Sequence, residues 1–330
     1  MIITRTPLRV SFIGGGTDLP AWYENHGEGQ VFGATIGLYV YVIVSPHWNP
    51  HRYRVAYSRT EDVDNLDYVS HGIIRNALRR AGLTLGGVEI HTIADIPGQG
   101  SGLGSSAAVA VGTLKALFDY QKRYLHFQDL AAMAAAIEIE DLRTGAGKQD
   151  HYIAAYGGVN HFRFSNADPL VSGGGGYVDE KIRDHWSKWM PLFSTGIHRH
   201  AEPILKETGK RIKAGMATGA LQRTLAMVEP MKLALLSGEM EAVGEMLDKA
   251  WKHKQAANPD AMPAGAVQMY RRALEAGALG GKLCGAGGGG YLLLVVPPRK
   301  WQAVADVVGQ QPVRVPYGVG GSTTIFVEQR

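Results

Sequence analysis

A glycine- and serine-rich loop is the part of the sequence best suited to chemistry. It reads PGQGSGLGSSAA over residues 97–108 and lies between an expected strand and an expected apolar helix. Glycines let a backbone approach a ligand closely, and the N–H groups at the start of the following helix favour a bound phosphate. The hydroxyls of Ser105 and Ser106 could add contacts to a phosphate or a hydrated metal ion. A tight turn with Ser105 as the helix cap is the alternative, and we favour phosphate binding.

Two further glycine clusters lie near the two ends of the chain. Residues 6–20 read TPLRVSFIGGGTDLP, in which Asp18 either accepts hydrogen bonds from sugar hydroxyls or caps a short helix at residues 19–25. Arg9 stands in an otherwise apolar strand, so it must reach the surface or find a counter-charge. Residues 282–290 read KLCGAGGGG between two expected strands. This is more glycine than a hairpin turn needs, so the segment is either a wide, flexible hairpin or backbone that lies against another loop or a ligand.

The familiar nucleotide-binding motifs do not fit these loops. The stretch GAGKQD at residues 145–150 lacks the spacing and the hydroxyl residue of a Walker loop. A dinucleotide fingerprint on Gly102, Gly104 and Ala107 would need a following strand and an acidic residue about 20 positions on, whereas another helix is expected here. The glycines of residues 285–290 precede a strand instead of a helix. The sequence therefore argues against NAD binding and against a dehydrogenase.

Composition restricts the class of protein and of ligand. The chain has 330 residues, which suggests about two domains. Its formal net charge of +4 suits small anionic ligands such as nucleotides but is too weak and too dispersed for nucleic acid. Cys284 is the single cysteine, which excludes an intrachain disulfide and a cysteine-based zinc site and favours a reducing, cytoplasmic location. The apolar runs are strand-sized, so we expect no membrane partner.

Hydrophobic periodicity and turn residues predict an α+β arrangement. In the first half we expect strands at residues 6–13, 30–37, 38–45, 53–57 and 88–93, and helices at 69–81, 105–124, 127–142 and from 150 onward. In the second half we expect helices at residues 203–214, 221–236, 240–257 and 263–276, and strands at 281–283, 291–296, 313–315 and 323–327. The stretch SNADPLVSGGGG at residues 165–176 is the candidate linker, which gives domains of residues 1–175 and 176–330.

Taken together, the three glycine clusters resemble the three motifs of the GHMP kinases, the family of galactokinase, homoserine kinase, mevalonate kinase and phosphomevalonate kinase. The resemblance rests on GLGSSAA at residues 102–108 combined with GAGGGG at residues 285–290. Within the family, four segments are most similar to D-glycero-D-manno-heptose 7-phosphate kinases: TPLRVSFIGGGTDLP (6–20), YRVAYSRTEDVD (53–64), GAGKQDHY (145–152) and STGIHRHAEPIL (194–205). The similarity extends over nearly the whole chain.

The resemblance implies a fold and an activity. The fold would have an N-terminal domain like ribosomal protein S5 and a ferredoxin-like C-terminal domain, with the active site between them. The activity would be ATP-dependent phosphorylation of the anomeric hydroxyl of a heptose 7-phosphate, which gives a 1,7-bisphosphate for activated-heptose synthesis and surface polysaccharide. The expected ligands are ATP, Mg²⁺ and a sugar phosphate, with a second copy of the chain as a candidate partner. Another anomeric sugar kinase, such as an L-fucokinase, and a sensor that binds ATP and sugar without catalysis are the alternatives.

The resemblance also assigns roles to individual residues. The ATP-binding residues would be Gly100, Gly102, Leu103, Gly104, Ser105 and Ser106. The substrate-binding residues would be Gly15, Gly16, Thr17, Asp18, Arg199, Gly287 and Gly288. Asp150 matches the family's catalytic aspartate, and Lys148 or Arg9 would stabilise it and the developing charge. The alternative role of Asp150 is to cap the next short helix.

Glu140 resembles the glutamate that holds Mg²⁺ together with Ser106. It lies on the edge of an apolar helix face, where a half-buried carboxylate needs a cation. An ion pair with Arg143, three residues later, is the alternative role of Glu140, and Glu138 is the second candidate ligand.

The sequence departs from the family pattern at two places and offers a cationic cluster at a third. The loop before Gly102 is one residue longer than usual, and His151 stands after the catalytic aspartate, where relatives often have glutamine. The segment GIHRHA places His198, Arg199 and His200 together. We expect these three residues either to receive the phosphate that the substrate already carries or to start a solvated helix.

Overall fold

The first part of the chain forms a large sheet whose strands β1 and β5 lead toward the glycine clusters. The computed structural model describes residues 1–96, 100–167, 169–172 and 178–328. The central strands lie side by side in the order β1 (Ile2–Ile13), β2 (Gly29–Pro46), β5 (Val88–Ala94), β3 (Tyr53–Ala56) and β4 (Thr60–Val63). The outer strands are β6 (Val159–Phe164), which pairs with β2, β7 (Leu170–Ser172), which pairs with β6, and β11 (Thr323–Val327), which pairs with β1.

A bulge in β2 allows one long strand to serve two parts of the sheet. The sequence predicts two strands at residues 30–37 and 38–45, and the structure joins them into one. Gly37 and Leu38 have no pairing partner in β1. Such a bulge bends a strand, so β2 pairs with β6 before the bulge and with β5 after it.

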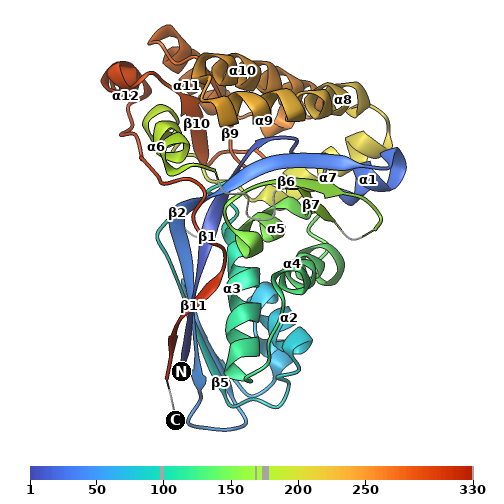
Figure 1. Cartoon of the computed structure of the whole chain (residues 1–330). Coiled ribbons are helices and arrows are strands. Elements are labelled where there is room, and N and C mark those ends of the chain that lie inside the picture. Colours follow the sequence, from blue (N-terminus) through green and yellow to red (C-terminus); the bar gives the residue numbers. More distant parts are fainter. Residues whose placement is uncertain (97–99, 168, 173–177, 329–330) are drawn as a thin grey trace.

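Helices cover one face of this sheet (Figure 1). They are α2 (Gly72–Ala81), α3 (Ser105–Tyr120), α4 (Phe127–Ala136) and α5 (Gln149–Tyr156). Helix α3 packs on β1 and β2 and is largely buried, as its apolar first turns predicted. Where α3 meets the sheet, a Cβ added to Gly112 would lie 2.7 Å from Thr6 Oγ1, so a larger residue there would force a neighbour to shift. This close contact holds α3, and with it Ser105 and Ser106 at its start, in place against β1.

The second part of the chain arranges helices around a small antiparallel sheet. Its strands lie in the order β8 (Leu192–Ser194), β10 (Tyr291–Val295) and β9 (Gly280–Leu283). The helices are α6 (Glu180–Trp189), α7 (Ala201–Lys213), α8 (Thr218–Ala226), α9 (Val228–Ser237), α10 (Met240–Ala257), α11 (Ala264–Glu275) and α12 (Trp301–Val308). This part also has the 3₁₀ turns Pro259–Ala261 and Pro298–Lys300, and the first part of the chain has the short helix α1 (Pro20–His26) and the 3₁₀ turn Leu66–Tyr68. Helix α10 packs directly on β9, which places it beside the third glycine cluster.

Two expected helices differ from the structure for identifiable reasons. The helix expected at residues 221–236 is divided into α8 and α9, because Pro230 has no N–H to donate to the carbonyl of Ala226. The helix expected at residues 127–142 ends as α4 and continues as a π-helical turn, Ile137–Asp141. Helices α6 and α12 and strands β4, β6, β7 and β8 were not expected. The strand expected at residues 313–315 is instead an isolated bridge between Val313 and Leu192.

The end of the chain returns to the first sheet. Strand β11, which the sequence placed in the second domain, pairs with β1. The rings of Phe12, Trp186 and Tyr317 join the two parts, with centroids 5.6, 6.0 and 6.3 Å apart. The expected boundary at 175–176 lies outside the described residues. Among the helices of the described ranges, none has the length and apolar character to span a membrane.

Candidate active site

The three glycine clusters meet at a cavity of about 410 Å³ between the two parts of the molecule. The second and third clusters touch, because a Cβ added to Gly102 would lie 2.5 Å from the carbonyl oxygen of Cys284, and one added to Gly285 would lie 2.8 Å from Cα of Gly102. The Tyr291 N–H also donates to the carbonyl oxygen of Ser101, at 3.1 Å. The third cluster is therefore backbone that lies against another loop, and not a free hairpin.

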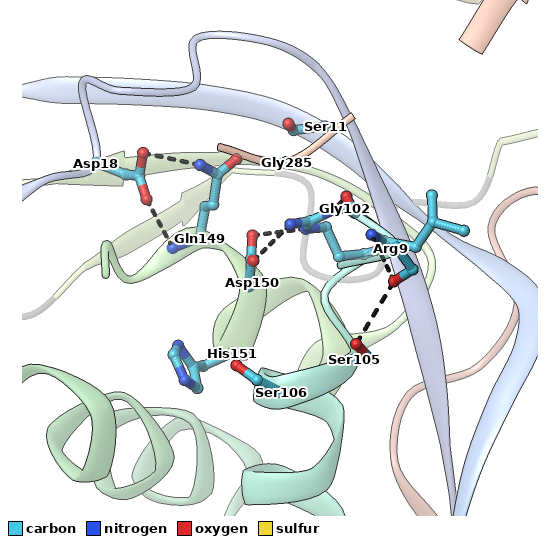
Figure 2. Close-up of polar contacts among 12 residues, drawn as sticks. Arg9, Ser11, Asp18, Gly102, Ser105, Ser106, Gln149, Asp150, His151 and Gly285 are labelled. Atoms are coloured by element: carbon cyan, nitrogen blue, oxygen red, sulfur yellow. Dashed lines mark hydrogen bonds and ion pairs between the residues drawn. The ribbon is translucent and has the colours of Figure 1, made fainter. Parts of the chain in front are cut away.

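Arg9 and Asp150 form an ion pair in this cavity (Figure 2). Arg9 Nε donates to Asp150 Oδ1 and Nη2 donates to Oδ2, each at 2.5 Å, while Nη1 donates to the carbonyl oxygen of Gly102 at 2.7 Å. Arg9 is only 4% exposed, so Asp150 is the counter-charge that its place in an apolar strand required. Burial opposes the charge of Arg9, but the attraction and hydrogen bonds of Asp150 outweigh burial and raise the pKa of Arg9. One side chain thus connects the catalytic candidate to the second glycine cluster.

Lys148 lies close to Asp150 in sequence but contacts a different residue. Its ammonium nitrogen lies over the ring of Tyr23, 4.8 Å from the centroid. Asp150 lines the cavity, whereas Lys148 is not among the lining residues. Arg9 forms the ion pair with Asp150, and support of Asp150 by Lys148 stays a prediction. Asp150 lies in the first turn of α5, after Gln149, and is not its cap residue.

Asp18 lines the same cavity and accepts hydrogen bonds from two segments (Figure 2). Its Oδ1 accepts from the N–H of Gly16 at 3.0 Å and from Nε2 of Gln149 at 2.9 Å, and its Oδ2 accepts from the N–H of Gln149 at 3.2 Å. Burial raises the pKa of Asp18 to about 6, the charge of Asp150 adds to this effect, and the hydrogen bonds oppose it. Asp18 does not cap α1, whose N-cap residue is Leu19. Gln149, which the sequence analysis missed, joins the first glycine cluster to α5.

Ser106 faces Glu138 and not Glu140. Ser106 Oγ donates to Glu138 Oε1 at 2.5 Å, and Glu138 Oε2 lies 2.7 Å from Nε2 of His151. Glu138 is buried and lines the cavity, whereas the Glu140 side chain is 68% exposed and contacts Arg80 at 3.1 Å. Residues two apart on a helix point to different sides, so only one of the two glutamates can face Ser106. The structure therefore contradicts the expectation that Glu140 lies beside Ser106, and the second candidate, Glu138, occupies that position.

The second glycine cluster presents the start of α3 to the cavity. Gly100, Gly102, Gly104, Ser105 and Ser106 line the cavity. Leu103 is instead fully buried, and its carbonyl oxygen accepts a hydrogen bond from the N–H of Arg9 at 3.0 Å. Because α3 begins at Ser105, the partial positive charge of its N-terminus faces the cavity, as a phosphate site requires. Residues 97–99 of the expected loop lie outside the described residues.

Some of the expected substrate residues of the first cluster line the cavity, and one does not. Gly15, Gly16 and Asp18 line the cavity, as does His200 from the cationic cluster. Thr17 does not, because its buried hydroxyl donates to the carbonyl oxygen of Gly14 at 2.7 Å. Thr17 therefore holds the turn that presents its neighbours.

Arg199, Gly287 and Gly288 are not among the residues that line the cavity. A Cβ added to Gly287 would lie 2.2 Å from a carbonyl oxygen of the turn Pro259–Ala261, and one added to Gly288 would lie 3.3 Å from Cβ of Arg199. A Cβ added to Gly100 would lie 3.1 Å from the backbone nitrogen of Arg199. The exposed Arg199 thus stands beside the second and third clusters, and this geometry does not support a role for it as a phosphate ligand inside the cavity.

Two lysines on the cavity wall were missed by the sequence analysis. Lys254 comes from α10 and Lys282 from β9. Lys254 Nζ donates to the carbonyl oxygens of Leu283 and Gly285, at 2.9 and 2.7 Å, and Lys282 Nζ donates to that of Ser11. Burial lowers the pKa of Lys254 to about 7 and that of Lys282 to about 8. The available signals were a lysine near the buried face of an amphipathic helix and another lysine within an apolar strand.

Two family models match the chain, one on each side of the cavity. The model described as "GHMP kinases N terminal domain" matches residues 67–158, and the one described as "GHMP kinases C terminal" matches residues 231–313. Together they span just over half of the chain. The first match includes Glu138 and Asp150, and the second includes both cavity lysines and the third glycine cluster.

Individual relatives agree with these models. A D-glycero-alpha-D-manno-heptose 7-phosphate kinase of Campylobacter jejuni is 29% identical over 321 residues, which cover 91% of this chain and 90% of that protein. An L-fucokinase/L-fucose-1-P guanylyltransferase of Bacteroides fragilis is 26% identical over 330 residues, 88% of this chain and 34% of that protein. A crystal structure of a D-glycero-D-manno-heptose 1-phosphate kinase from Bacteroides thetaiotaomicron matches with a TM-score of 0.80 and 25% identity, covering 100% of both chains. The chain therefore belongs to the GHMP kinases, with the α+β fold of that family, and it is a kinase.

Proposed function

We propose that this kinase transfers the γ-phosphoryl group of ATP to the anomeric hydroxyl of D-glycero-D-manno-heptose 7-phosphate. The product would be the 1,7-bisphosphate, which leads to nucleotide-linked heptose for surface polysaccharide. Similarity to the Campylobacter jejuni heptose 7-phosphate kinase over nine-tenths of both chains supports this acceptor. The observation that carries the proposal is the Arg9–Asp150 pair, which lies in the same cavity as the start of α3.

The second glycine cluster would bind the ATP phosphates, with Mg²⁺ beside them. The N-terminus of α3 attracts negative charge, and Ser106 and Glu138 place a hydroxyl and a carboxylate 2.5 Å apart in the cavity. These hard oxygen donors suit Mg²⁺, so the residues present fit the ion. When bound, Mg²⁺ would neutralise charge on the β- and γ-phosphates. His151, which contacts the other oxygen of Glu138, would keep that carboxylate in its orientation.

Asp150 would accept the proton of the acceptor hydroxyl. Phosphoryl transfer needs little covalent assistance, so an enzyme contributes mainly positioning and charge stabilisation. Arg9 holds both oxygens of Asp150 and also binds the carbonyl oxygen of Gly102, which fixes the base relative to the phosphate loop. The same guanidinium would stabilise the negative charge that develops between them. Asp18 would bind a sugar hydroxyl, because its carboxylate lines the cavity at the first glycine cluster.

An L-fucokinase is the second candidate, and the Bacteroides fragilis relative supports it. The two acceptors differ in a way that is easily tested, because L-fucose carries no phosphate. A sensor without catalysis has no use for a base held by a buried arginine, so the Arg9–Asp150 pair argues against it.

The test compares acceptors with Mg-ATP: heptose 7-phosphate, the unphosphorylated heptose, L-fucose and galactose. We expect kcat/KM for heptose 7-phosphate to exceed that for each other sugar on the order of 100-fold. Asp150→Asn keeps the shape of the side chain but removes the base, so it should lower kcat on the order of 100- to 10,000-fold with ATP affinity retained. Asp129→Asn, at an exposed position of α4, is the matched control. A preference for L-fucose, or full activity of the Asp150→Asn enzyme, would overturn the proposal.

A further inference from the structure

Two cations on the cavity wall, Lys254 and Lys282, have no carboxylate partner among the residues that the structure describes. Each carboxylate that lines the cavity has another partner: Asp150 pairs with Arg9, Glu138 with His151 and Glu202 with Lys206, while Asp18 accepts three N–H groups. Lys254 donates to two backbone carbonyl oxygens, and Lys282 donates to the carbonyl oxygens of Ser11 and Phe12 and to the Ser11 hydroxyl oxygen. Carbonyl dipoles neutralise only part of a full charge, so an ammonium group that they hold still attracts an anion.

This arrangement is unfavourable until an anion enters the cavity. Burial opposes the ammonium charge of both lysines, Lys282 repels Lys254, and Arg9 repels both. Asp150 and Asp18 attract Lys282, each less strongly than Arg9 repels it. Arg9 is already paired with Asp150 and cannot serve a second full anion in the same way. A phosphate monoester carries a charge of about −1.5 to −2 at neutral pH, which matches two adjacent cations better than the single charge of a carboxylate does.

The position of Lys282 favours the acceptor over ATP as the source of this phosphate. Lys282 Nζ contacts β1 at the carbonyl oxygens of Ser11 and Phe12, just before the first glycine cluster, which carries the residue proposed to bind the sugar. The donors proposed for ATP and Mg²⁺ come instead from α3 and the π-helical turn. Lys254 comes from α10, in the other part of the molecule.

We propose that Lys254 and Lys282 form a second anion subsite, separate from the phosphate loop, which binds the phosphate ester that the acceptor sugar already carries. This inference rests on the proposed function and deepens it. It also replaces the expectation for Arg199, whose exposed side chain lies outside the cavity lining.

Kinetics with and without the acceptor phosphate test this subsite. Lys254→Met and Lys282→Met should each raise KM for heptose 7-phosphate by about 10- to 100-fold, the usual loss for a charged hydrogen bond. KM for ATP and kcat/KM for the unphosphorylated heptose should change clearly less than KM for heptose 7-phosphate, since neither uses the subsite and each variant affects them only through the lost carbonyl contacts of its lysine. Lys252→Met is the matched control on α10, because Lys252 is 68% exposed and pairs with Asp248. Equal losses with both sugars, or a rise in KM for ATP, would overturn the proposal.

A measurement on the unaltered enzyme covers the case in which a variant fails to fold. Acylation of individual lysines at pH 8 is followed by mass spectrometry, with and without inorganic phosphate. Bound phosphate should protect Lys254 and Lys282 at least several-fold and leave Lys252 unaffected, because a bound anion keeps the two ammonium groups protonated and unreactive. Full protection by Mg-ATP alone, with no further effect of phosphate, would mean that the lysines serve ATP, and it would overturn the proposal.

The two experiments separate failure of the subsite from failure of the proposed function. If the wild-type enzyme does not turn over heptose 7-phosphate while inorganic phosphate still protects both lysines, the anion subsite stands and the proposed acceptor falls. If heptose 7-phosphate is turned over and phosphate protects neither lysine, the proposed function stands and the subsite falls.

Discussion

At the scale of single residues, the site depends on buried charges with different partners. Asp150 is held by the guanidinium of Arg9 through two hydrogen bonds. Asp18 is held only by N–H groups among the described residues, and its pKa is raised to about 6 by burial and by the charge of Asp150. The hydrogen bonds that Asp18 accepts favour its charged form and therefore oppose this rise. In the proposed mechanism Asp150 accepts the proton and Asp18 binds a sugar hydroxyl.

The raised pKa of Asp18 predicts a pH dependence of stability. Its ordinary pKa is 3.8 and its pKa in the folded protein is about 6. Between these values the folded state binds a proton that the unfolded state has lost, so this contribution to the free energy of unfolding is present at low pH and is lost as the pH rises through 6. From pH 5 to pH 7 the wild type should lose roughly 1 kcal/mol relative to Asp18→Asn. Urea unfolding of both proteins at the two pH values measures this, and identical pH dependences would refute it.

At the scale of elements, short irregular turns decide which side chains reach the cavity. The π-helical turn Ile137–Asp141 directs Glu138 toward Ser106 and Glu140 toward Arg80 on the surface. The third glycine cluster is a second irregular segment that shapes the cavity. Its backbone lies against that of the second cluster, with no space for a side chain between them.

Exchange of each glutamate tests the assignment of the metal ligand. Glu138→Gln should raise the Mg²⁺ concentration needed for half-maximal activity on the order of 10- to 100-fold, because a carboxylate oxygen beside Ser106 is lost. Glu140→Gln should stay within about twofold of the wild type, since an exposed ion pair contributes little. Binding of Mn²⁺, followed by electron paramagnetic resonance, gives the same comparison without turnover. A larger effect at Glu140 than at Glu138 would restore the original expectation.

Alanine at Gly285 tests the contact between the glycine clusters. Gly285 has φ +65°, and an added Cβ would lie 2.8 Å from Cα of Gly102, so one of the two loops must shift. We expect KM for ATP to rise about 10-fold or more, since small displacements at a reacting site are costly. Gly309→Ala is the matched control, because Gly309 has φ +72° but nothing within 4 Å. It should cost about 1 kcal/mol of stability and leave KM for ATP unchanged. Equal KM values for the two variants would contradict the proposed role of the contact.

The parts of the site that the sequence predicted are those that depend on local pattern. The second glycine cluster precedes a helix, and Arg9 in an apolar strand needs a counter-charge, so both were identifiable from their neighbours. Glu138 was only the second choice, because a sequence does not show where an α-helix becomes a π-helical turn. Lys148 was an alternative to Arg9 as the cation beside Asp150, because the sequence shows neither how α5 begins nor which cation reaches that carboxylate. Lys254 was missed because its neighbours belong to distant segments.

At the scale of the whole molecule, the cavity exists because two parts of the chain are joined on one side of it. Strand β11 returns to the first sheet, and Phe12, which lines the cavity, packs against Trp186 and Tyr317 from the second part. The N-terminal part supplies the second glycine cluster and Asp150, and the C-terminal part supplies Lys254 and Lys282. Such contacts between distant segments determine which groups share a site, and no local sequence pattern specifies them.

The central claim is that this cavity carries a phosphorylated heptose with its anomeric hydroxyl at Asp150. The most direct measurement is ³¹P nuclear magnetic resonance of the product formed by the wild-type enzyme from Mg-ATP and D-glycero-D-manno-heptose 7-phosphate. We expect one new phosphomonoester signal, coupled to the anomeric proton and equal in amount to the ADP released. A new phosphate on any other carbon, or no product from heptose 7-phosphate under conditions in which an unphosphorylated sugar reacts, would contradict it.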